Sequence, residues 1–553
     1  MPAAHDPSQP PSRAEQAQAV LFERLGWRIA ERDERAVIEQ AIRTGEIDAI
    51  YGLEEGAALD RFWGFISWLG VDKLLASIKG EGIKRVMVSM VQFVVLYLLK
   101  TVYGVPSVEA LPALLFCSEA AMRLAGFNGH QVSDGVSQRS QYKRKPGDKR
   151  IGPVSVDAIR ENLGKIAPAE LERVFNDTIK ALAKRRMFPK TCCASLDTSL
   201  LEVGPSFEGA GVTSRRERKN RTVGGEVVTI THRIRGFKVG AIMEISLRIP
   251  IAVVIETAEF SDVNMTRRLV QQARENLGEH GELERLVFDR GFLDGADLAW
   301  LTEQEILFVI PAKKEMHVYA DAVGLATLTP GERATRTEKA SRRRRLSSEN
   351  PMVEVHAVGL HGLTSYSEYG TDVKSSAANS KKFKPTPINA VVITESGKCA
   401  REEPLVLLTN SSVREPFYTL DAYWERATIE NCLFREGKQS LHLEHPFQRN
   451  ADAMKVHVFF TLLVLALCRA FRAFEAKDDQ RQERGLPSTL EQFRRRLKAE
   501  TANKIIVFAA GKFGIFPVAE WTILCGFGVR EAGLKGIGDR ASILAKYGIA
   551  SGP

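Results

Sequence analysis

The stretch Cys192-Cys193-Ala194-Ser195-Leu196-Asp197 decides the fold of this chain, because a short apolar run with strand character ends in a carboxylate. A second run, Leu286-Val287-Phe288-Asp289, ends in the same way and is followed by Arg290-Gly291-Phe292. Both patterns are typical of a buried strand. We therefore expect Asp197 and Asp289 at the ends of two strands.

A third carboxylate lies on a predicted helix. The stretch Tyr423-Trp424-Glu425-Arg426-Ala427-Thr428-Ile429-Glu430-Asn431 contains neither Pro nor Gly and is typical of a helix. Taken alone, Asp289 fits an ordinary turn and Glu430 fits a solvated helix surface. Asp197 is different, because a carboxylate inside an apolar strand is destabilising unless a metal or a cation compensates its charge. Together, two carboxylates on strands and one on a helix can hold two magnesium ions.

The order and the element types of these residues resemble the DDE transposases of bacterial insertion sequences, in the group whose RNase H-like core is interrupted by a β-rich insertion. The resemblance covers residues 190–520. That group has a Tyr, an Arg three residues later, the catalytic Glu four residues beyond, and a Lys seven residues after the Glu. Tyr423, Arg426 and Glu430 fit, whereas Lys438 lies one position late. At about 100° per residue Lys438 is turned by about 80° from Glu430, so it needs a local bulge or its long side chain to reach the same phosphate.

The resemblance implies a DNA transposase, which cleaves DNA at transposon ends and transfers the strand into target DNA in a metal-dependent reaction. It implies that Asp197, Asp289 and Glu430 are the catalytic residues and the ligands of two Mg²⁺ ions, for which Mn²⁺ can substitute. Tyr423, Arg426 and Lys438 are then expected to contact DNA. The implied partners are the inverted repeats at the transposon ends and the target, both double-stranded DNA, and we expect a homodimer on DNA.

Two other functions stay open. One is an inactive or domesticated transposase that only binds DNA; the presence of all three carboxylates argues against it. The other is an RNase H-like nuclease without strand transfer. A strand-transfer assay separates the two from a transposase.

Charge agrees with a nucleic-acid partner. The chain has 77 Lys and Arg against 68 Asp and Glu, which gives a net charge of +9. Four local basic clusters stand out, at residues 215–221, 342–345, 381–384 and 494–498. Each cluster fits a solvated loop or helix face as well as it fits a DNA contact.

The sequence also favours a location. Seven cysteines occur without a Cys-x-x-Cys pair, and Cys192-Cys193 is typical of a buried strand, which favours a reducing cytosol. Residues 1–13 lack the apolar segment of an export signal. The apolar runs at 86–99 and 458–468 are shorter than the about 20 residues of a membrane-spanning helix. We therefore expect a bacterial cytoplasmic, nucleoid-associated protein without membrane contact.

Changes in composition divide the chain. We expect a disordered N-terminus over residues 1–17 and an all-helical DNA-binding or support region over residues 18–189. Within that region, residues 131–142 and the basic residues 143–146 fit the second helix of a helix-turn-helix, and a purely supporting helical bundle fits equally well. The other expected parts are an RNase H-like core at 190–310 and 406–475, a β-rich insertion domain at 311–405 and a C-terminal helical region at 476–553.

The core is expected to be α/β, a mixed sheet flanked by helices. Three strands, a helix, a strand, a helix and a strand follow one another, at residues 225–234, 237–247, 249–257, 262–277, 284–289, 294–304 and 306–310. With the strand that ends at Asp197, this is the RNase H-like order. Neighbouring strands then bring the two aspartates together.

Overall fold

Two compact units make up the chain. The computed structural model describes residues 33–55, 57–82, 88–127, 131–132, 153–223, 226–328, 332–339, 352–366, 385–397, 399–479, 491, 494, 502–526 and 538–550. One unit consists of Met1–Gly64, Pro112–Val154 and Arg494–Pro553, the other of Phe65–Leu111 and Ser155–Phe493. The predicted disordered N-terminus, most of the helix-turn-helix candidate and the basic clusters at 342–345 and 381–384 lie outside the described residues.

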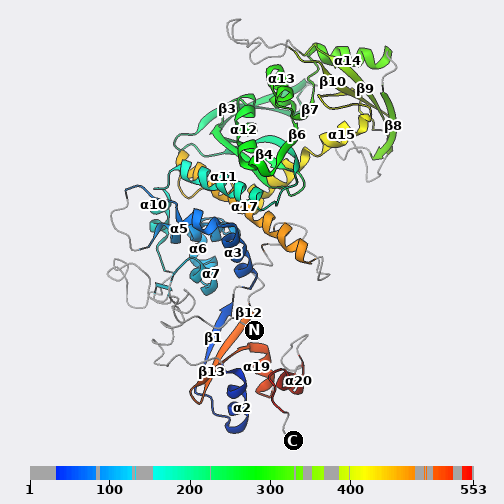
Figure 1. Ribbon diagram of the computed structural model, residues 1–553. Helices are drawn as coiled ribbons and strands as arrows, with labels where there is room; N and C mark the ends of the chain where they lie inside the picture. The colour runs from blue at the N-terminus through cyan, green and yellow to red at the C-terminus, as the bar shows by residue number, and fades with distance from the viewer. Residues whose placement is uncertain are drawn as a thin grey trace. The chain divides into compact units, whose positions relative to one another are not determined.

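A ten-stranded mixed sheet forms the centre of the larger unit (Figure 1). Its strands run in the order β3-β4-β2-β6-β7-β11-β10-β9-β8, and β5 also pairs with β4. The strands are β2 (Thr191–Glu202), β3 (Gly211–Val223), β4 (Glu226–Glu244), β5 (Pro250–Thr257), β6 (Glu282–Phe288), β7 (Leu307–Pro311), β8 (Glu332–Lys339), β9 (Met352–Leu363), β10 (Ile388–Ser396) and β11 (Leu405–Thr409). Strand β6 is parallel to β2 and to β7, and the other pairs are antiparallel.

The RNase H-like core predicted from the sequence is confirmed in the strands β5-β4-β2-β6-β7. Parallel neighbours need crossover connections, and two helices supply them. Helix α12 (Thr266–Leu277) connects β5 to β6, and α13 (Gly295–Glu303) connects β6 to β7. Leu269, Val270 and Ala273 are buried on α12, which packs against β4, β5 and β6. This packing fixes β2 beside β6, where the two aspartates lie.

Strand β4 is a single long strand, where the sequence analysis expected two. Its first half pairs with β3 and its second half lies between β2 and β5, with the change at Gly236. A Cβ atom at Gly236 would lie 2.1 Å from the Leu201 carbonyl oxygen, so only glycine allows this close approach to β2. Gly236 therefore continues the strand rather than ending it.

We expect Gly236→Ala to lower the free energy of unfolding by about 1 to 3 kcal/mol, because the added methyl group overpacks a site bounded by backbone. Chemical denaturation followed by circular dichroism measures this. Gly204→Ala is the matched control, since a Cβ atom there would have no neighbour within 4 Å. Equal midpoints for the two variants would contradict the close approach.

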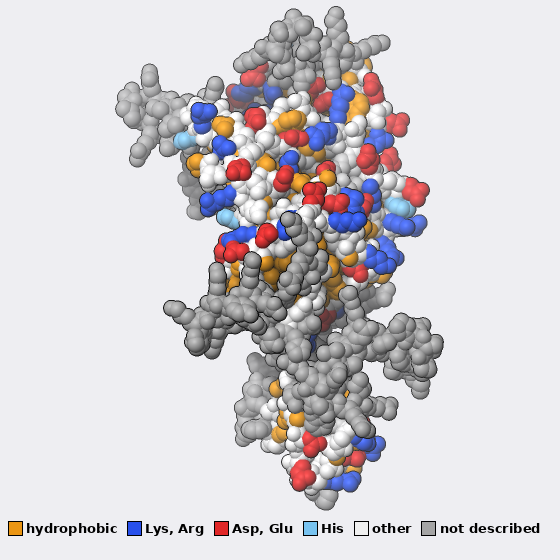
Figure 2. Space-filling view, turned by 90° about the vertical axis from the view of Figure 1, so that its left-hand side faces the viewer, with side chains coloured by type: hydrophobic (Ala, Val, Ile, Leu, Met, Phe, Trp, Pro, Cys, Tyr) orange, Lys and Arg blue, Asp and Glu red, His pale blue; other side chains and the backbone are white. Residues whose placement is uncertain are grey.

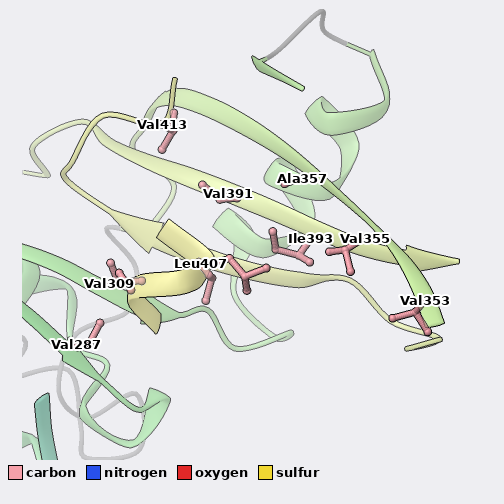
Figure 3. Packing of buried hydrophobic residues seen from close by; sticks show 11 residues of the cluster. Val287, Val309, Val353, Val355, Ala357, Val391, Ile393, Leu407 and Val413 are labelled. Atoms are coloured by element: carbon pink, nitrogen blue, oxygen red, sulfur yellow. The ribbon is translucent and has the colours of Figure 1, made fainter. Parts of the chain in front are cut away.

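The segment over residues 311–405 is β-rich, as predicted, but it is not a separate inserted domain. It continues the core sheet, because β11 pairs with β7 in the register Leu407↔Pro311 and Leu408↔Ile310. One hydrophobic cluster joins Val287 of β6 and Val309 of β7 to residues of β9, β10 and β11 (Figure 3). The physical reason is that β7 would otherwise be an edge strand with unpaired backbone groups, which the apolar β11 satisfies. The segment also contains α14 (His317–Leu328), which packs against β9 and β10.

Helices from distant parts of the sequence complete the larger unit. Helix α11 (Pro168–Lys184) packs along α12 and α17 (Ala451–Asp479), and α17 also packs along α5 (Met90–Val102). Among the described residues, α17 is the one helix long and apolar enough to span a membrane, and 83% of its most apolar window is buried inside the protein. The remaining helices here are α4 (Val71–Ala76), α10 (Val156–Leu163), α15 (Pro416–Trp424) and α16 (Glu436–Ser440).

The smaller unit contains a three-stranded sheet of β1 (Ala49–Glu55), β12 (Ala502–Ala509) and β13 (Lys512–Pro517). The predictions of an all-helical N-terminal region and a helical C-terminal region are therefore wrong here. Strand β1 pairs with β12 across most of the sequence, from Ala49↔Phe508 to Glu55↔Ala502, which local patterns do not reveal. Helices α2 (Glu34–Thr44), α19 (Val518–Leu524) and α20 (Arg540–Lys546) contribute residues to the core of this unit. The other α-helices among the described residues up to Phe127 are α3 (Ala57–Leu69), α6 (Leu111–Leu114) and α7 (Glu119–Leu124), in addition to α4 and α5 of the larger unit.

Candidate active site

Asp197 and Asp289 occupy equivalent positions on neighbouring strands. The parallel register of β2 and β6 pairs Leu196 with Phe288, and each aspartate is the next residue. Neighbouring strands lie about 4.8 Å apart, so the two carboxylates start side by side. Strand β6 ends at Phe288, one residue before the predicted end at Asp289. Strand β2 continues to Glu202, so the expectation that Asp197 ends its strand is wrong. Strand β4 pairs with β2 beyond this point and keeps it extended.

Asp197 is largely buried, with 14% of its side chain exposed. Burial, together with the nearby carboxylates of Glu430 and Asp289, raises the pKa of Asp197 to about 7. The hydrogen bond that Asp197 Oδ1 accepts from the Thr198 backbone N–H, at 2.8 Å, and the charge of Arg426 act in the opposite direction. The positive charge near Asp197 is therefore too small to keep the pKa of this carboxyl group at its ordinary value. A bound cation would stabilise the charged carboxylate.

Glu430 approaches Asp197 from a π-helix, Ile429–Arg435, that lies against β2. Arg426 joins the two carboxylates: its Nη1 atom is 2.6 Å from Glu430 Oε1 and 3.5 Å from Asp197 Oδ2. The two oxygens are thus at most 6.1 Å apart, the sum of these distances. Burial alone would lower the pKa of Arg426, but the hydrogen bond to Glu430 and the negative charges of Glu430 and Asp289 together raise this pKa. The guanidinium group therefore pairs with both carboxylates, but its single positive charge balances only one of them.

The chemistry of this site fits divalent metal ions. Its ligands would be carboxylate oxygens, which Mg²⁺ prefers, and two ions about 3.5 to 4 Å apart can bridge carboxylates on different elements. Over the described ranges, no three His, Cys, Asp or Glu side chains are already gathered around one point. Metal binding would therefore require Arg426 to release Asp197 and Glu430. That Asp197, Asp289 and Glu430 jointly bind metal stays a prediction.

Tyr423 lies beside Arg426 at the same site. The Arg426 guanidinium is 5.9 Å from the centre of the Tyr423 ring. Burial raises the pKa of Tyr423, as does the charge of Asp289, so the hydroxyl group stays protonated and can donate a hydrogen bond. Arg426 therefore lies between the Tyr423 ring and the carboxylates of Asp197 and Glu430, and the binding of DNA by Tyr423 and Arg426 stays a prediction.

The position of Lys438 depends on the π-helix. Hydrogen bonds from residue i to i+5 give a π-helical turn more residues than an α-helical turn, which offsets the extra residue between Glu430 and Lys438. This is the local bulge that the spacing required. The Lys438 amine donates to the Leu200 carbonyl oxygen at 2.8 Å and pairs with Glu444 at 2.8 Å. Lys438 therefore contacts β2 three residues beyond Asp197.

Two arginines that the sequence analysis missed, the buried Arg285 and the partly exposed Arg336, hold helix α15 at the site. Arg285 of β6 pairs with Glu425 at 3.1 Å and donates to the Tyr418 hydroxyl at 2.6 Å. Arg336 of β8 donates two hydrogen bonds to Asp421, at 2.6 and 2.8 Å. The available signal for Arg285 was an arginine directly before the apolar run 286–288. Strand β8 thus also supports the position of Tyr423 and Arg426.

A further carboxylate, Asp262, lies next to the site. It accepts a hydrogen bond from the Thr198 hydroxyl at 3.2 Å and pairs with Lys238 at 2.9 Å. The sequence concealed it, because an aspartate that precedes a helix usually caps that helix, whereas this side chain bonds β2 instead. Lys238 neutralises Asp262, which distinguishes it from Asp197.

The family model described as the transposase DDE domain matches residues 212–467. This range contains Asp289 and Glu430 and begins after Asp197. Together with the RNase H-like strand order and the paired aspartates, this match identifies residues 212–467 as a transposase DDE domain. A search of curated proteins found no match. Among solved structures, the chain is similar to the piggyBac transposase in its synaptic complex with hairpin DNA, with 9% identity and a TM-score of 0.35 over 84% of this chain and 79% of that chain.

Proposed function

We propose that this transposase cleaves the DNA at transposon ends and joins the freed end to target DNA, using Asp197, Asp289 and Glu430. The observation that carries the proposal is the side-by-side start of the two aspartates on β2 and β6, with Glu430 joined to Asp197 through Arg426. Asp197 and Asp289 would hold two Mg²⁺ ions, or Mn²⁺ in their place, and Glu430 would complete the ligands of one ion.

The bound metal ions would supply activation of a water molecule and stabilisation of the leaving 3′ oxygen. In cleavage, the water oxygen bonds to phosphorus and the P–O3′ bond breaks, which frees a 3′-hydroxyl group. That hydroxyl then attacks a phosphorus of the target, so a new phosphodiester bond forms and the target's 3′ oxygen leaves. No covalent protein–DNA intermediate is needed. The same three carboxylates would hold the metal ions during both steps.

Arg426, Lys438 and Tyr423 would bind the phosphates. When a metal ion binds Asp197 and Glu430, the guanidinium group of Arg426 would be released from both carboxylates and could pair with a phosphate oxygen. The Tyr423 hydroxyl would donate a hydrogen bond, and Lys438 would add charge beside β2. The site would thus exchange one set of ion pairs for another as DNA and metal bind.

The wider DNA surface would combine several segments. Strands β3 and β4 form a hairpin ribbon, and its sequence includes the basic cluster at residues 215–221. On the face drawn in Figure 2, Lys and Arg side chains are mixed with Asp and Glu side chains. We propose that the transposon-end repeats and the target are both bound as double-stranded DNA, by a homodimer in the bacterial cytoplasm close to the nucleoid.

A cleavage and strand-transfer assay tests the proposal. The substrate is a duplex that carries the inverted repeats flanking the gene, incubated with the full chain and supercoiled plasmid in Mg²⁺, Mn²⁺ or Ca²⁺. Joined products in Mg²⁺ are expected. Cleavage without joining would indicate an RNase H-like nuclease, and binding without cleavage would indicate an inactive DNA-binding protein.

Arg426→Ala is expected to weaken DNA binding by about 1.5 to 3 kcal/mol, because it removes one charge-assisted phosphate bond, and to slow cleavage as well. Binding titrations at several salt concentrations measure this, and the slope of log affinity against log salt should become shallower by about 0.9. Arg435→Ala, an exposed arginine on the π-helix that contacts Asn431 at 3.4 Å, is the matched control. An unchanged slope for Arg426→Ala would rule out its phosphate contact.

A further inference from the structure

Arg469 is a buried arginine of α17 with only 5% of its surface exposed. Its Nη2 atom donates to the Cys432 carbonyl oxygen at 2.5 Å and to Glu436 Oε2 at 2.7 Å. Its Nη1 atom donates to the Arg248 carbonyl oxygen. Cys432 lies in the middle of the π-helix and Glu436 directly follows it. One guanidinium group therefore joins α17 to the π-helix and to the turn between β4 and β5.

The acceptor on the β4–β5 turn is itself fixed. Arg248 has a positive φ of 61°, in a turn that the buried Glu244 organises. Glu244 accepts hydrogen bonds from the Ser246 N–H at 2.9 Å, the Ser246 hydroxyl at 2.6 Å and the Leu247 N–H at 2.7 Å. Arg469 is thus anchored to the core sheet, and the π-helix is the element it can hold in place.

The burial pattern shows that the π-helix carries one extra residue. From the first residue of the π-helix to the C-cap residue of α16, the buried positions are Ile429, Leu433, Phe434, Gly437 and Leu441. At about 100° per residue, an α-helix would spread these positions over about 140°. Removing one residue after Ile429 would bring them within about 100°, which is the usual apolar stripe. The π-helical turn takes up this extra residue.

We propose that Arg469 is a positioning residue: it holds the π-helical turn, so that Glu430 before it and Lys438 after it face the same site. A π-helical turn departs from the regular hydrogen bonding of an α-helix. Arg469 compensates for this because its guanidinium group donates a hydrogen bond to the Cys432 carbonyl oxygen. Without it, the segment would relax toward an α-helix, which turns Lys438 by about 80° relative to Glu430. This inference rests on the proposed function, because its consequence is measured as DNA cleavage.

The test must separate positioning from simple stability. Arg469→Met alone would leave the Glu436 carboxylate, 28% exposed, without its partner. The double variant Arg469→Met/Glu436→Gln removes both charges, and replacing a buried ion pair in this way is often neutral or stabilising. We expect it to keep the melting temperature and the DNA affinity of the wild type, while cleavage falls by about 100-fold because the carboxylate is misplaced.

Deletion of Asn431, an exposed residue of the π-helix, provides the decisive readout. In an α-helix the deletion places Lys438 seven residues after Glu430, within about 20° of it. The deletion therefore removes the need for the π-turn and should restore cleavage to Arg469→Met/Glu436→Gln by at least about 10-fold, a gain of 1.4 kcal/mol. A merely structural role of Arg469 predicts no such rescue.

Three outcomes decide the inference. Loss of cleavage in the double variant with rescue by the deletion supports it. Wild-type cleavage by the double variant overturns it, and so does loss of cleavage that the deletion does not rescue. The wild-type protein is measured alongside: if it fails to cleave, the proposed function fails instead, and the arginine is then tested by crystallography of the double variant, where an unchanged π-helix overturns the inference.

Discussion

Asp197→Asn is expected to lower DNA cleavage by at least about 1,000-fold while DNA binding persists. The change removes one negative charge from the ligands that would hold both metal ions, and such ions contribute several kcal/mol to the transition state. It leaves the basic side chains of the site in place. Binding could even strengthen slightly, because a carboxylate near the phosphates is removed. Gel-shift assays in Ca²⁺ and cleavage assays in Mg²⁺, on one oligonucleotide, measure the two effects separately.

The control for this prediction is Asp157→Asn, which changes a carboxylate that is 93% exposed on α10. It should leave cleavage and binding unchanged. Persistent cutting by the Asp197→Asn protein would end the assignment of Asp197 as a metal ligand. Loss of both cutting and binding would indicate instead that the variant fails to fold, which circular dichroism would reveal.

Lys100→Met is expected to stabilise the protein by about 3 kcal/mol at pH 7. Lys100 is 1% exposed, and its amine lies 5.1 Å from the Tyr97 ring centre without a hydrogen-bond partner among the described residues. Burial lowers its pKa from 10.5 to about 8. As the pH falls from 10.5 to 8, the unfolded chain takes up a proton that the folded chain does not, so stability is lost across this window. Methionine removes that loss.

The pH dependence distinguishes this effect from better packing. The gain from Lys100→Met should shrink to about 1.5 kcal/mol at pH 9.5, because the folded lysine is then neutral. Urea denaturation at both pH values measures the gain. Lys180→Met on α11, where the lysine side chain is 50% exposed, is the control and should change stability by no more than about 0.5 kcal/mol. An equal gain at both pH values would show that Lys100 carries no charge-related cost.

The RNase H-like core was predictable because its signals are local. The apolar runs that lead to Asp197 and Asp289, and the helices between the later strands, follow from hydrophobic periodicity alone. The continuation of the sheet through β11 was not predictable, since the choice between a separate domain and an added strand depends on the free edge of β7. The pairing of β1 with β12 was hidden for a related reason: the short β1 sequence is a strand only when its distant partner is present.

The candidate site was predictable in its residues but not in its contacts. Parallel neighbours placed Asp197 beside Asp289. The spacing of Tyr423, Arg426 and Glu430 predicted one continuous helix, which is wrong, because α15 ends at Trp424 and Glu430 lies on the π-helix Ile429–Arg435. The bridge of Arg426 between two carboxylates depends on side-chain geometry, which no pattern specifies. The π-helix did leave a trace in the sequence, in the late position of Lys438 and in the apolar spacing after Ile429, which fits an α-helix poorly.

The sheet of the smaller unit has a consequence for synthesis of the protein on the ribosome. Ala49 of β1 pairs with Phe508 of β12, so the strand made early must wait for one made 459 residues later, the difference of the two residue numbers. At about 5 to 20 residues per second, this wait lasts roughly 20 to 90 seconds. The catalytic core ends at α17 and can therefore fold while β1 is still unpaired. A nascent chain arrested before residue 502 should thus contain a protease-resistant core and a protease-sensitive first segment.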